Sequence, residues 1–299
     1  MAHVISKTTF LDFLNCPKNV WLKLHKPELL KHFVLSEFEK HIMEQGNEVE
    51  SYARNLFPGG IEIVSTGEDA CQETVRHITS KIPVLFQATF IEEGFIARND
   101  VLVHDAKNSC WDLYEIKGTN AVKEEGTSDR DHITDLAFQA SILKRAKLQM
   151  GRYYVVHPNK EYVRHGDLDV QALFKVEDET EKVLARLATI EPQMEGAREY
   201  LNREKEPGGA CDCVYKSRRN HCATFQHINP DMPEYGVHDI SRIHKTKLAL
   251  LMERKIHSLD DVPEDFKLSD NQWNQVHAHK KQEPAIDIEK IKEELDALV

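Results

Sequence analysis

The sequence predicts an α/β fold in which a mixed β-sheet is flanked by helices. The first observation is a group of three segments rich in branched and aromatic residues, which favours strands at 84–90, 94–104 and 110–117. The second is helical periodicity on either side of this group, at about 36–56 and at about 130–148. With one more strand after the second helix, the order of helix, three strands, helix and strand indicates a single sheet with helices packed on it.

The region before this sheet is expected to be helical. A short helix is predicted at about 7–15, followed by Cys16-Pro17 and a second helical stretch through Trp21 and Leu24. The longer helix that begins near residue 36 should end at Phe57-Pro58-Gly59-Gly60, because proline and glycine interrupt helices.

Turn residues define the elements of the sheet. The cluster Asp105-Ala106-Lys107-Asn108-Ser109 separates two predicted strands, which should therefore form an antiparallel hairpin. The helix that follows carries one apolar stripe, made of Ile133, Leu136, Ala137, Ala140 and Leu143. Gly151 ends this helix, and the run 153–156 before Pro158 predicts a short buried strand.

The C-terminal third has a different character. A helical region is predicted at about 177–203, and a group of cysteines begins at Cys211. From 228 to 299 the pattern indicates short charged helices with thin apolar content, so this section is expected to be an appendage without a core of its own. The predicted organisation is a domain at 1–227 and a helical C-terminal appendage at 228–299.

Charge and composition restrict the possible functions. With 39 Lys plus Arg against 50 Asp plus Glu, the net charge of -11 argues against a protein that simply coats nucleic acid. A nuclease needs only a local basic track, and two groups could supply it or could equally be solvated faces: Lys18, Lys23, Lys26 and Lys31, and Lys216, Arg218 and Arg219. There is no secretory signal and no apolar run of the roughly 18 residues that span a bilayer, so a cytoplasmic protein without a membrane segment is expected.

The predicted hairpin carries the residues that could take part in catalysis. If residues 106–109 close it, Asp105 faces Cys110 and, counting back, Asp100 faces Glu115. Glu115 and Lys117 are two apart on a strand and so share a face. Directly opposed residues have Cβ atoms about 4.5 to 5.5 Å apart, so two carboxylates and an ammonium should converge.

Such a site is suited to phosphodiester hydrolysis. Two close carboxylates repel unless a cation lies between them, and oxygen ligands select Mg²⁺ or Mn²⁺. The ion could polarise a phosphoryl oxygen and acidify a water, while Lys117 positions that water or stabilises developing charge. Glu-x-Lys is common, however, and an incidental ion pair on a solvated hairpin face is the alternative reading of the same residues.

Four of the six cysteines have a spacing that suggests ligands. In a reducing compartment, cysteines more often bind metals or clusters than form disulfides. Cys16 stands alone, whereas Cys211, Cys213 and Cys222 are grouped, and four converging thiolates can hold a cluster or zinc. Ordinary buried thiols are the other interpretation. Cys71 and Cys110 fit no ligand spacing.

Several segments resemble a known superfamily. The stretch from Asp100 to Lys117, the segment Asp135-Leu136-Ala137-Phe138-Gln139 and the flanking cysteines resemble the PD-(D/E)XK superfamily, in particular the RecB-like nucleases with an iron-sulfur cluster. These include the CRISPR-associated RecB-like exonucleases and the nuclease domain of AddAB-type helicase-nucleases. Further segments resemble the N-terminal half of an uncharacterised bacterial family in that group, namely 13–18, 46–49, 53–60 and 159–164.

The resemblance implies a restriction-endonuclease-like core and a set of site residues. It implies metal ligation by Asp100 and Glu115, catalysis by Lys117, and a Gln139 that orders the site and the nucleic-acid backbone, although Gln139 could merely cap a strand edge. It places a further metal ligand four residues after a glycine, which fits Glu50 after Gly46, with Glu48 as the alternative.

The resemblance also implies a cluster site. It implies that Cys16, Cys211, Cys213 and Cys222 hold a 4Fe-4S cluster joining the two ends of the domain. The spacing here is Cys-x-Cys-x8-Cys where the relatives usually have Cys-x2-Cys-x5-Cys, so zinc stays open.

The expected function is a metal-dependent DNA nuclease, with an exonuclease on single strands or duplex ends favoured, in repair, recombination or defence. The alternative is a non-catalytic nucleic-acid-binding or scaffolding module that keeps the fold and the cluster. A third interpretation is an N-terminal piece of a larger nuclease, whose C-terminal helices dock a missing or separate nuclease or helicase partner.

Overall fold

The computed structural model describes residues 3–30, 37–119, 121–122, 131–209, 211–284, 286 and 288–297. The chain divides into two compact units, one of residues 1–25 and 32–206, and one of residues 26–31 and 207–299. The division falls before the grouped cysteines, whereas the boundary predicted from the sequence lies at 227/228.

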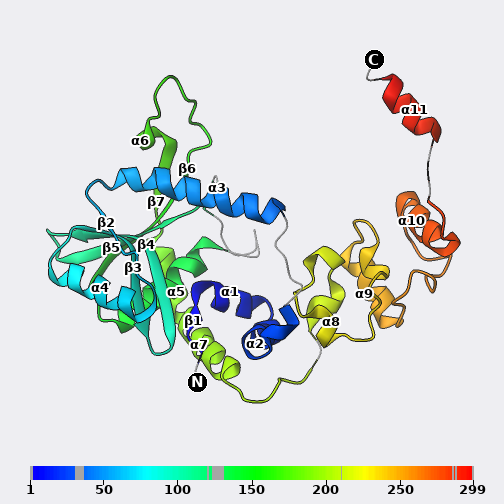
Figure 1. Cartoon of the computed structure of the whole chain (residues 1–299), viewed down its shortest axis with the longest axis horizontal. Helices are drawn as coiled ribbons and strands as arrows, with labels where there is room; N and C mark the ends of the chain where they lie inside the picture. Colours follow the sequence, from blue (N-terminus) through cyan, green and yellow to red (C-terminus); the bar gives the residue numbers. More distant parts are fainter. Residues whose placement is uncertain are drawn as a thin grey trace. The chain divides into compact units, whose positions relative to one another are not determined.

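The first unit is built on a seven-stranded mixed sheet (Figure 1). Its strands are β1 Ile5–Ser6, β2 Ile61–Glu62, β3 Val84–Glu92, β4 Phe95–Asp105, β5 Cys110–Ile116, β6 Met150–Pro158 and β7 Phe174–Asp178. The order is β2-β3-β4-β5-β6-β7, and β1 pairs with the start of β4. Because β3, β4 and β5 run antiparallel while β5 and β6 run parallel, the sheet is mixed, and the predicted α/β fold class is confirmed.

Helices cover this sheet. They are α1 Lys7–Asn15, α2 Pro17–His25, α3 Glu37–Ala53, α4 Gly67–Thr79, α5 His132–Arg145, α6 Val170–Leu173 and α7 Thr180–Leu201. The predicted order of helix, three strands, helix and strand corresponds to α3 or α4, then β3 to β5, α5 and β6. Side-chain caps fix where α1 and α5 begin. The Ser6 side chain accepts from the Thr9 N–H, and the Asp131 side chain accepts from the Thr134 N–H.

The two faces of the sheet are covered differently. One face carries a buried apolar cluster that includes Val101, Ile116, Val156 and Ala53 of α3. Helix α5, in which every residue from 132 to 143 is buried, packs on β3, β4 and β6. In Figure 1, α3 and α5 lie on opposite sides of the sheet. A side chain on α5 can therefore meet only those strand residues that point away from the apolar cluster.

Several elements of the first unit were not predicted, among them the short strands β1 and β2, the helices α4 and α6, and strand β7. Helix α4 fully buries only Ala70 and Thr74, and most of its other residues are at least partly exposed. Strand β7 is five residues long and alternates Phe174 and Val176 with charged residues at the edge of the sheet. The predicted helix at 177–203 therefore begins later than expected, at Thr180.

The second unit has a core of its own, so the expectation of a coreless appendage is wrong. Helices α8 Phe225–Ile228, α9 Lys245–Glu253, α10 Asp270–Lys281 and α11 Ile288–Asp296 belong to it. Ten buried residues form the core: Val237, Ile240, Ile243, Leu248, Leu251, Met252, Leu259, Val262, Phe266 and Val276. Many of them lie in turns between the helices, and for that reason no single segment showed an apolar periodicity.

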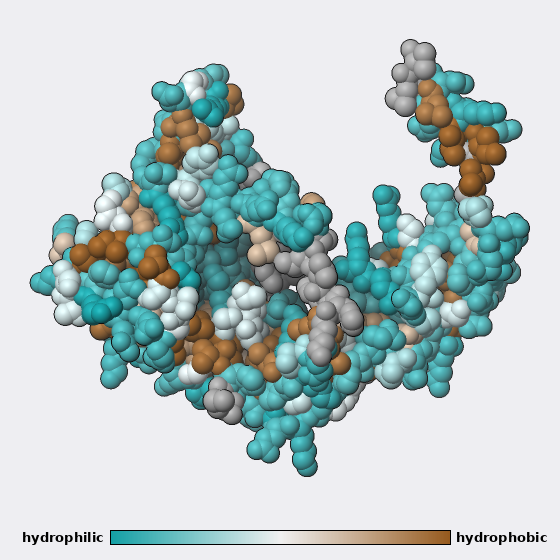
Figure 2. Space-filling model, viewed as in Figure 1, coloured by the Kyte–Doolittle hydropathy of each residue, from teal (hydrophilic) through white to brown (hydrophobic). Residues whose placement is uncertain are grey.

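The surface of α11 is amphipathic. Ile288, Ile291 and Leu295 are exposed, and they follow one side of this helix as an apolar stripe (Figure 2). Docking of a partner on the C-terminal helices stays a prediction. Within the described part of the chain, no helix combines the length and the apolar character that a bilayer span requires.

Candidate active site

The hairpin formed by β4 and β5 has the predicted register. Asp105 pairs with Cys110, and the pairing continues to Val101 and Tyr114. The next step along the same register sets Asp100 opposite Glu115, and the Ile116 N–H donates to Asp100 Oδ2 at 2.8 Å. Because Val101 belongs to the apolar cluster on one face, Asp100 and Glu115 point to the other face, where α5 lies.

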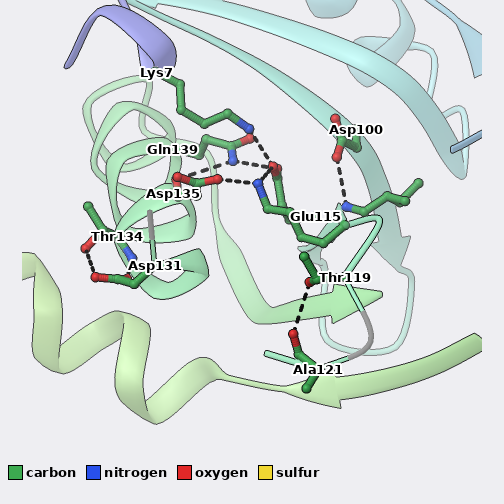
Figure 3. Close-up of polar contacts among 11 residues, drawn as sticks. Lys7, Asp100, Glu115, Thr119, Ala121, Asp131, Thr134, Asp135 and Gln139 are labelled. Carbon is green, nitrogen blue, oxygen red and sulfur yellow. Dashed lines mark hydrogen bonds and ion pairs between the residues drawn. The ribbon is translucent and has the colours of Figure 1, made fainter. Parts of the chain in front are cut away.

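Glu115 is the centre of the polar network on this face (Figure 3). It is 1% exposed and receives contacts at both carboxylate oxygens. The ammonium nitrogens of Lys7 and Lys117 lie 2.5 and 2.9 Å from Oε1, and Gln139 Nε2 donates to Oε2 at 2.7 Å. Residues from α1, β5 and α5 are therefore joined through one buried acid.

Lys117 connects this acid to a second one on α5. It follows β5 directly, and its N–H donates to the Val156 carbonyl at 2.8 Å, so the adjacent strand holds its backbone. Its ammonium group contacts Glu115 and also forms an ion pair with Asp135. The lysine is thus held between two carboxylates.

Two acceptors near Glu115 remain available. Among the described residues, the buried atoms Asp135 Oδ1 and Gln139 Oε1 have no hydrogen-bond partner. An unsatisfied buried polar atom costs about 1 to 3 kcal/mol, so native structures rarely keep one without a reason. A cation or a hydrogen-bond donor beside either oxygen would satisfy it.

The two hairpin acids have opposite pKa shifts. Burial, and then the charge of Glu115, raises the pKa of Asp100 to about 7. Burial also disfavours charge on Glu115, but the ammonium groups of Lys117 and Lys7 outweigh burial and hold the pKa of Glu115 well below its usual range. Near neutral pH, Glu115 is therefore ionised, whereas Asp100 is partly protonated.

Both lysines remain charged. Burial opposes the charge on Lys117, but Glu115 and Asp135 outweigh it and raise the pKa of Lys117 above its usual range. Burial opposes the charge on Lys7 as well, but the carboxylates of Glu115, Asp100 and Asp135 together outweigh it and raise the pKa of Lys7. Neither lysine can act as a base near neutral pH, so both can serve only as hydrogen-bond donors and positive charges.

Glu50, the further candidate ligand, lies on α3 near Asp100. It is half-buried, whereas the alternative Glu48 is exposed. Its Oε1 accepts from Gln87 Nε2 at 2.6 Å and from Arg54 Nη2 at 2.7 Å, and its charge contributes to the raised pKa of Asp100. The geometry thus favours Glu50 over Glu48, but its role as a ligand stays a prediction.

Gln87 has an unusual backbone conformation. It lies in β3 across from Asp100, between the pairs Phe86 with Val101 and Ala88 with Asn99, and its φ is 58°. A non-glycine residue with positive φ inside a strand is strained, and such strain concentrates at functional sites.

The predicted cysteine ligands are divided between the units. Cys16 follows α1 in the first unit. In the second unit Cys211 and Cys213 are buried, and their sulfur atoms lie within 4.8 Å of each other. Asn229 Nδ2 lies 4.0 Å from Cys211 Sγ, and Cys222 Sγ lies 3.7 Å from Thr224 Oγ1. Ligation by all four cysteines stays a prediction.

Sequence reasoning missed Lys7 and Asp135 as members of the site. Lys7 is 108 residues from Glu115 in the chain, and no pattern marks it. Asp135 could have been found, because it lies four residues before Gln139 and so shares a face of α5 with it.

Comparisons with known proteins find similarity among solved structures, and it is distant. No family model matches the chain, and no curated protein sequence matches it. Among solved structures, the chain is similar to an alkaline exonuclease from Laribacter hongkongensis, with a TM-score of 0.34 and 16% sequence identity. The similarity covers 67% of this chain and 92% of that chain.

Proposed function

We propose that the first unit is a divalent-metal-dependent DNA nuclease of the PD-(D/E)XK type that hydrolyses phosphodiester bonds in single strands or at DNA ends. The observation that carries the proposal is the convergence of Asp100, Glu115 and Lys117 on one face of the sheet. Asp100 and Glu115 disfavour each other's charge, which is the condition that a bound cation relieves.

The donor set fits Mg²⁺ or Mn²⁺. Asp100 and Glu115 supply carboxylate oxygens, and the unpartnered oxygens of Asp135 and Gln139 are hard donors of the same kind. When bound, the ion would polarise the phosphoryl group and acidify a water. Glu50 could contribute a further carboxylate from α3.

The protein's own residues have separate tasks. Lys117 stays protonated, so it stabilises negative charge on the phosphoryl oxygens and does not abstract a proton. Gln139 holds the Glu115 carboxylate in one orientation through its hydrogen bond to Oε2. Asp100 would supply a carboxylate oxygen to the cation, whose positive charge would favour the ionised form of this buried acid.

A cleavage assay tests this function. Labelled single- and double-stranded DNA should be degraded with Mn²⁺ and left intact with EDTA, and Glu115→Gln should lose the activity. Glu177→Gln changes a half-exposed acid on β7 and serves as the matched control, which should keep full activity. Activity that survives Glu115→Gln would exclude this site, and an inactive chain would support the non-catalytic binding module.

Lys7 should compete with the metal ion. Its ammonium group occupies Glu115 Oε1, so Lys7→Met should strengthen Mn²⁺ binding by about threefold to tenfold, which corresponds to roughly 1 kcal/mol. Titration calorimetry on the metal-free protein measures this, with Lys175→Met on β7 as the control. Weaker Mn²⁺ binding by Lys7→Met would mean that Lys7 assists the ion instead of replacing it.

We also propose that Cys16, Cys211, Cys213 and Cys222 hold a 4Fe-4S cluster, with zinc as the alternative. The pair Cys211 and Cys213 fits such a group, since two buried sulfurs lie close together beside the amide of Asn229. Cys213→Ser should lower bound iron and the melting temperature together, and Cys71→Ser should change neither. A colourless, zinc-containing protein would replace the iron assignment.

A further inference from the structure

A cleft of about 1250 Å³ in the second unit is lined by basic side chains from two segments. Lys216 and Arg219 come from the turns after the paired cysteines, and Arg242 and Lys245 come from the segment that leads into α9. All four are exposed. None of them has a carboxylate within ion-pair distance in the part of the chain that is described.

A fifth cation of this cleft has a structural task instead. The Arg218 guanidinium donates to both carboxylate oxygens of Asp239 at 3.0 Å, and also to the Pro233 carbonyl at 2.9 Å. This bidentate pair connects the two segments that line the cleft. It therefore positions the four unpaired cations while its own charge is neutralised.

The floor of the cleft is formed by apolar residues of the core of this unit. Ile240, Ile243 and Leu248 line it and belong to the buried core of the unit. His238 also lines it and is 1% exposed; its Nε2 contacts the Val214 carbonyl at 2.8 Å, while its Nδ1 has no partner among the described residues.

We propose that this cleft binds the phosphate backbone of a single-stranded nucleic acid. The proposal rests on the nuclease function and deepens it, because the strand held here would be the substrate of the first unit. Four unpaired cations on a chain with a net charge of -11 form a local attraction for a polyanion. Tyr215, which is 44% exposed at the cleft, offers an aromatic face for an unpaired base.

Two backbone features at the cleft also favour binding of an anion. Arg242 has a φ of 50°, a conformation that non-glycine residues rarely adopt and that occurs at ligand clamps. The first turn of α9 opens at the same cleft with Lys245 and Thr246, so the positive end of the helix dipole is added to the side-chain charges.

Binding of labelled oligothymidylate in EDTA tests the proposal without any cleavage. The double variant Lys216→Glu/Arg219→Glu should bind at least about tenfold more weakly, and the slope of log K against log salt should fall by about one to two. The matched control Lys267→Glu/Lys281→Glu makes the same charge change at exposed residues of the same unit outside the cleft, and should stay within about twofold of the unmodified chain.

Tyr215 separates single strands from other polyanions. Tyr215→Ala should weaken oligothymidylate binding, and Tyr215→Phe should retain it, because stacking needs only the ring. Unchanged affinity in the Lys216→Glu/Arg219→Glu protein would overturn the proposal. Competition by poly-glutamate as strong as that by oligothymidylate, or tighter binding of duplex than of single strands, would also overturn it.

Failure of the strand-binding proposal can be distinguished from failure of the proposed nuclease function. A chain that binds oligothymidylate through the cleft but cleaves nothing with Mn²⁺ removes the nuclease function and keeps the strand-binding cleft. If the protein cleaves DNA but the Lys216→Glu/Arg219→Glu variant binds oligothymidylate as tightly as the Lys267→Glu/Lys281→Glu control, only the strand-binding role of the cleft is excluded.

Discussion

Lys117→Met should lower the single-turnover rate of DNA cleavage by about 10²- to 10³-fold, the usual cost of removing one donor to a developing oxyanion. Lys117 stays charged because Glu115 and Asp135 raise its pKa, and it is held on the sheet by its own N–H. The loss should appear in the rate and not in DNA affinity measured in EDTA, since a charge that acts on the transition state changes the chemical step.

Stability must be separated from catalysis in this variant. Lys117 pairs with two buried acids, so Lys117→Met leaves Asp135 without its ammonium partner and lowers the melting temperature. Rates are therefore measured well below the melting temperature and divided by the folded fraction from circular dichroism. Lys117→Arg keeps the charge and should retain part of the rate. A Lys117→Met protein as fast as the unmodified one would show that the lysine is only structural.

The hairpin could be predicted because its geometry is local. Five turn-forming residues set the loop, the loop sets the register, and the register brings Asp100 opposite Glu115. The side-chain period of two then places Glu115 and Lys117 together. These relations need no knowledge of the rest of the chain.

Contacts across long stretches of sequence could not be predicted. Lys7 reaches Glu115 because the chain before α1 adds β1 to the sheet beside β4, and a two-residue strand leaves no pattern in the sequence. The core of the second unit was missed for a related reason, since its apolar residues are spread over turns and three-dimensional packing alone brings them together. The pattern of one segment does not contain this information.

Asp100→Asn should abolish cleavage and yet stabilise the metal-free protein at pH 8, by on the order of 2 kcal/mol. The pKa of Asp100 is raised from its ordinary 3.8 to about 7. Between these values the folded protein holds a proton that the unfolded chain has lost, so the free energy of unfolding falls as pH rises through this window and is level above it. Asparagine removes this penalty and can still accept from the Ile116 N–H.

Glu115→Gln, in the same site, should change stability in the opposite direction. Because Lys117 and Lys7 lower the pKa of Glu115, its ionised form contributes stability above the ordinary pKa, and this stability is lost as pH falls below it. Glu115→Gln should therefore destabilise the protein at pH 8, leaving two buried ammonium groups without their shared acid. Urea unfolding of both variants in EDTA, from pH 5 to pH 9, measures the two effects. If Asp100→Asn destabilised the protein at pH 8, ionised Asp100 would not be unfavourable beside Glu115 in the metal-free protein. The proposed reason for the site to bind a cation, relief of this repulsion, would then fail.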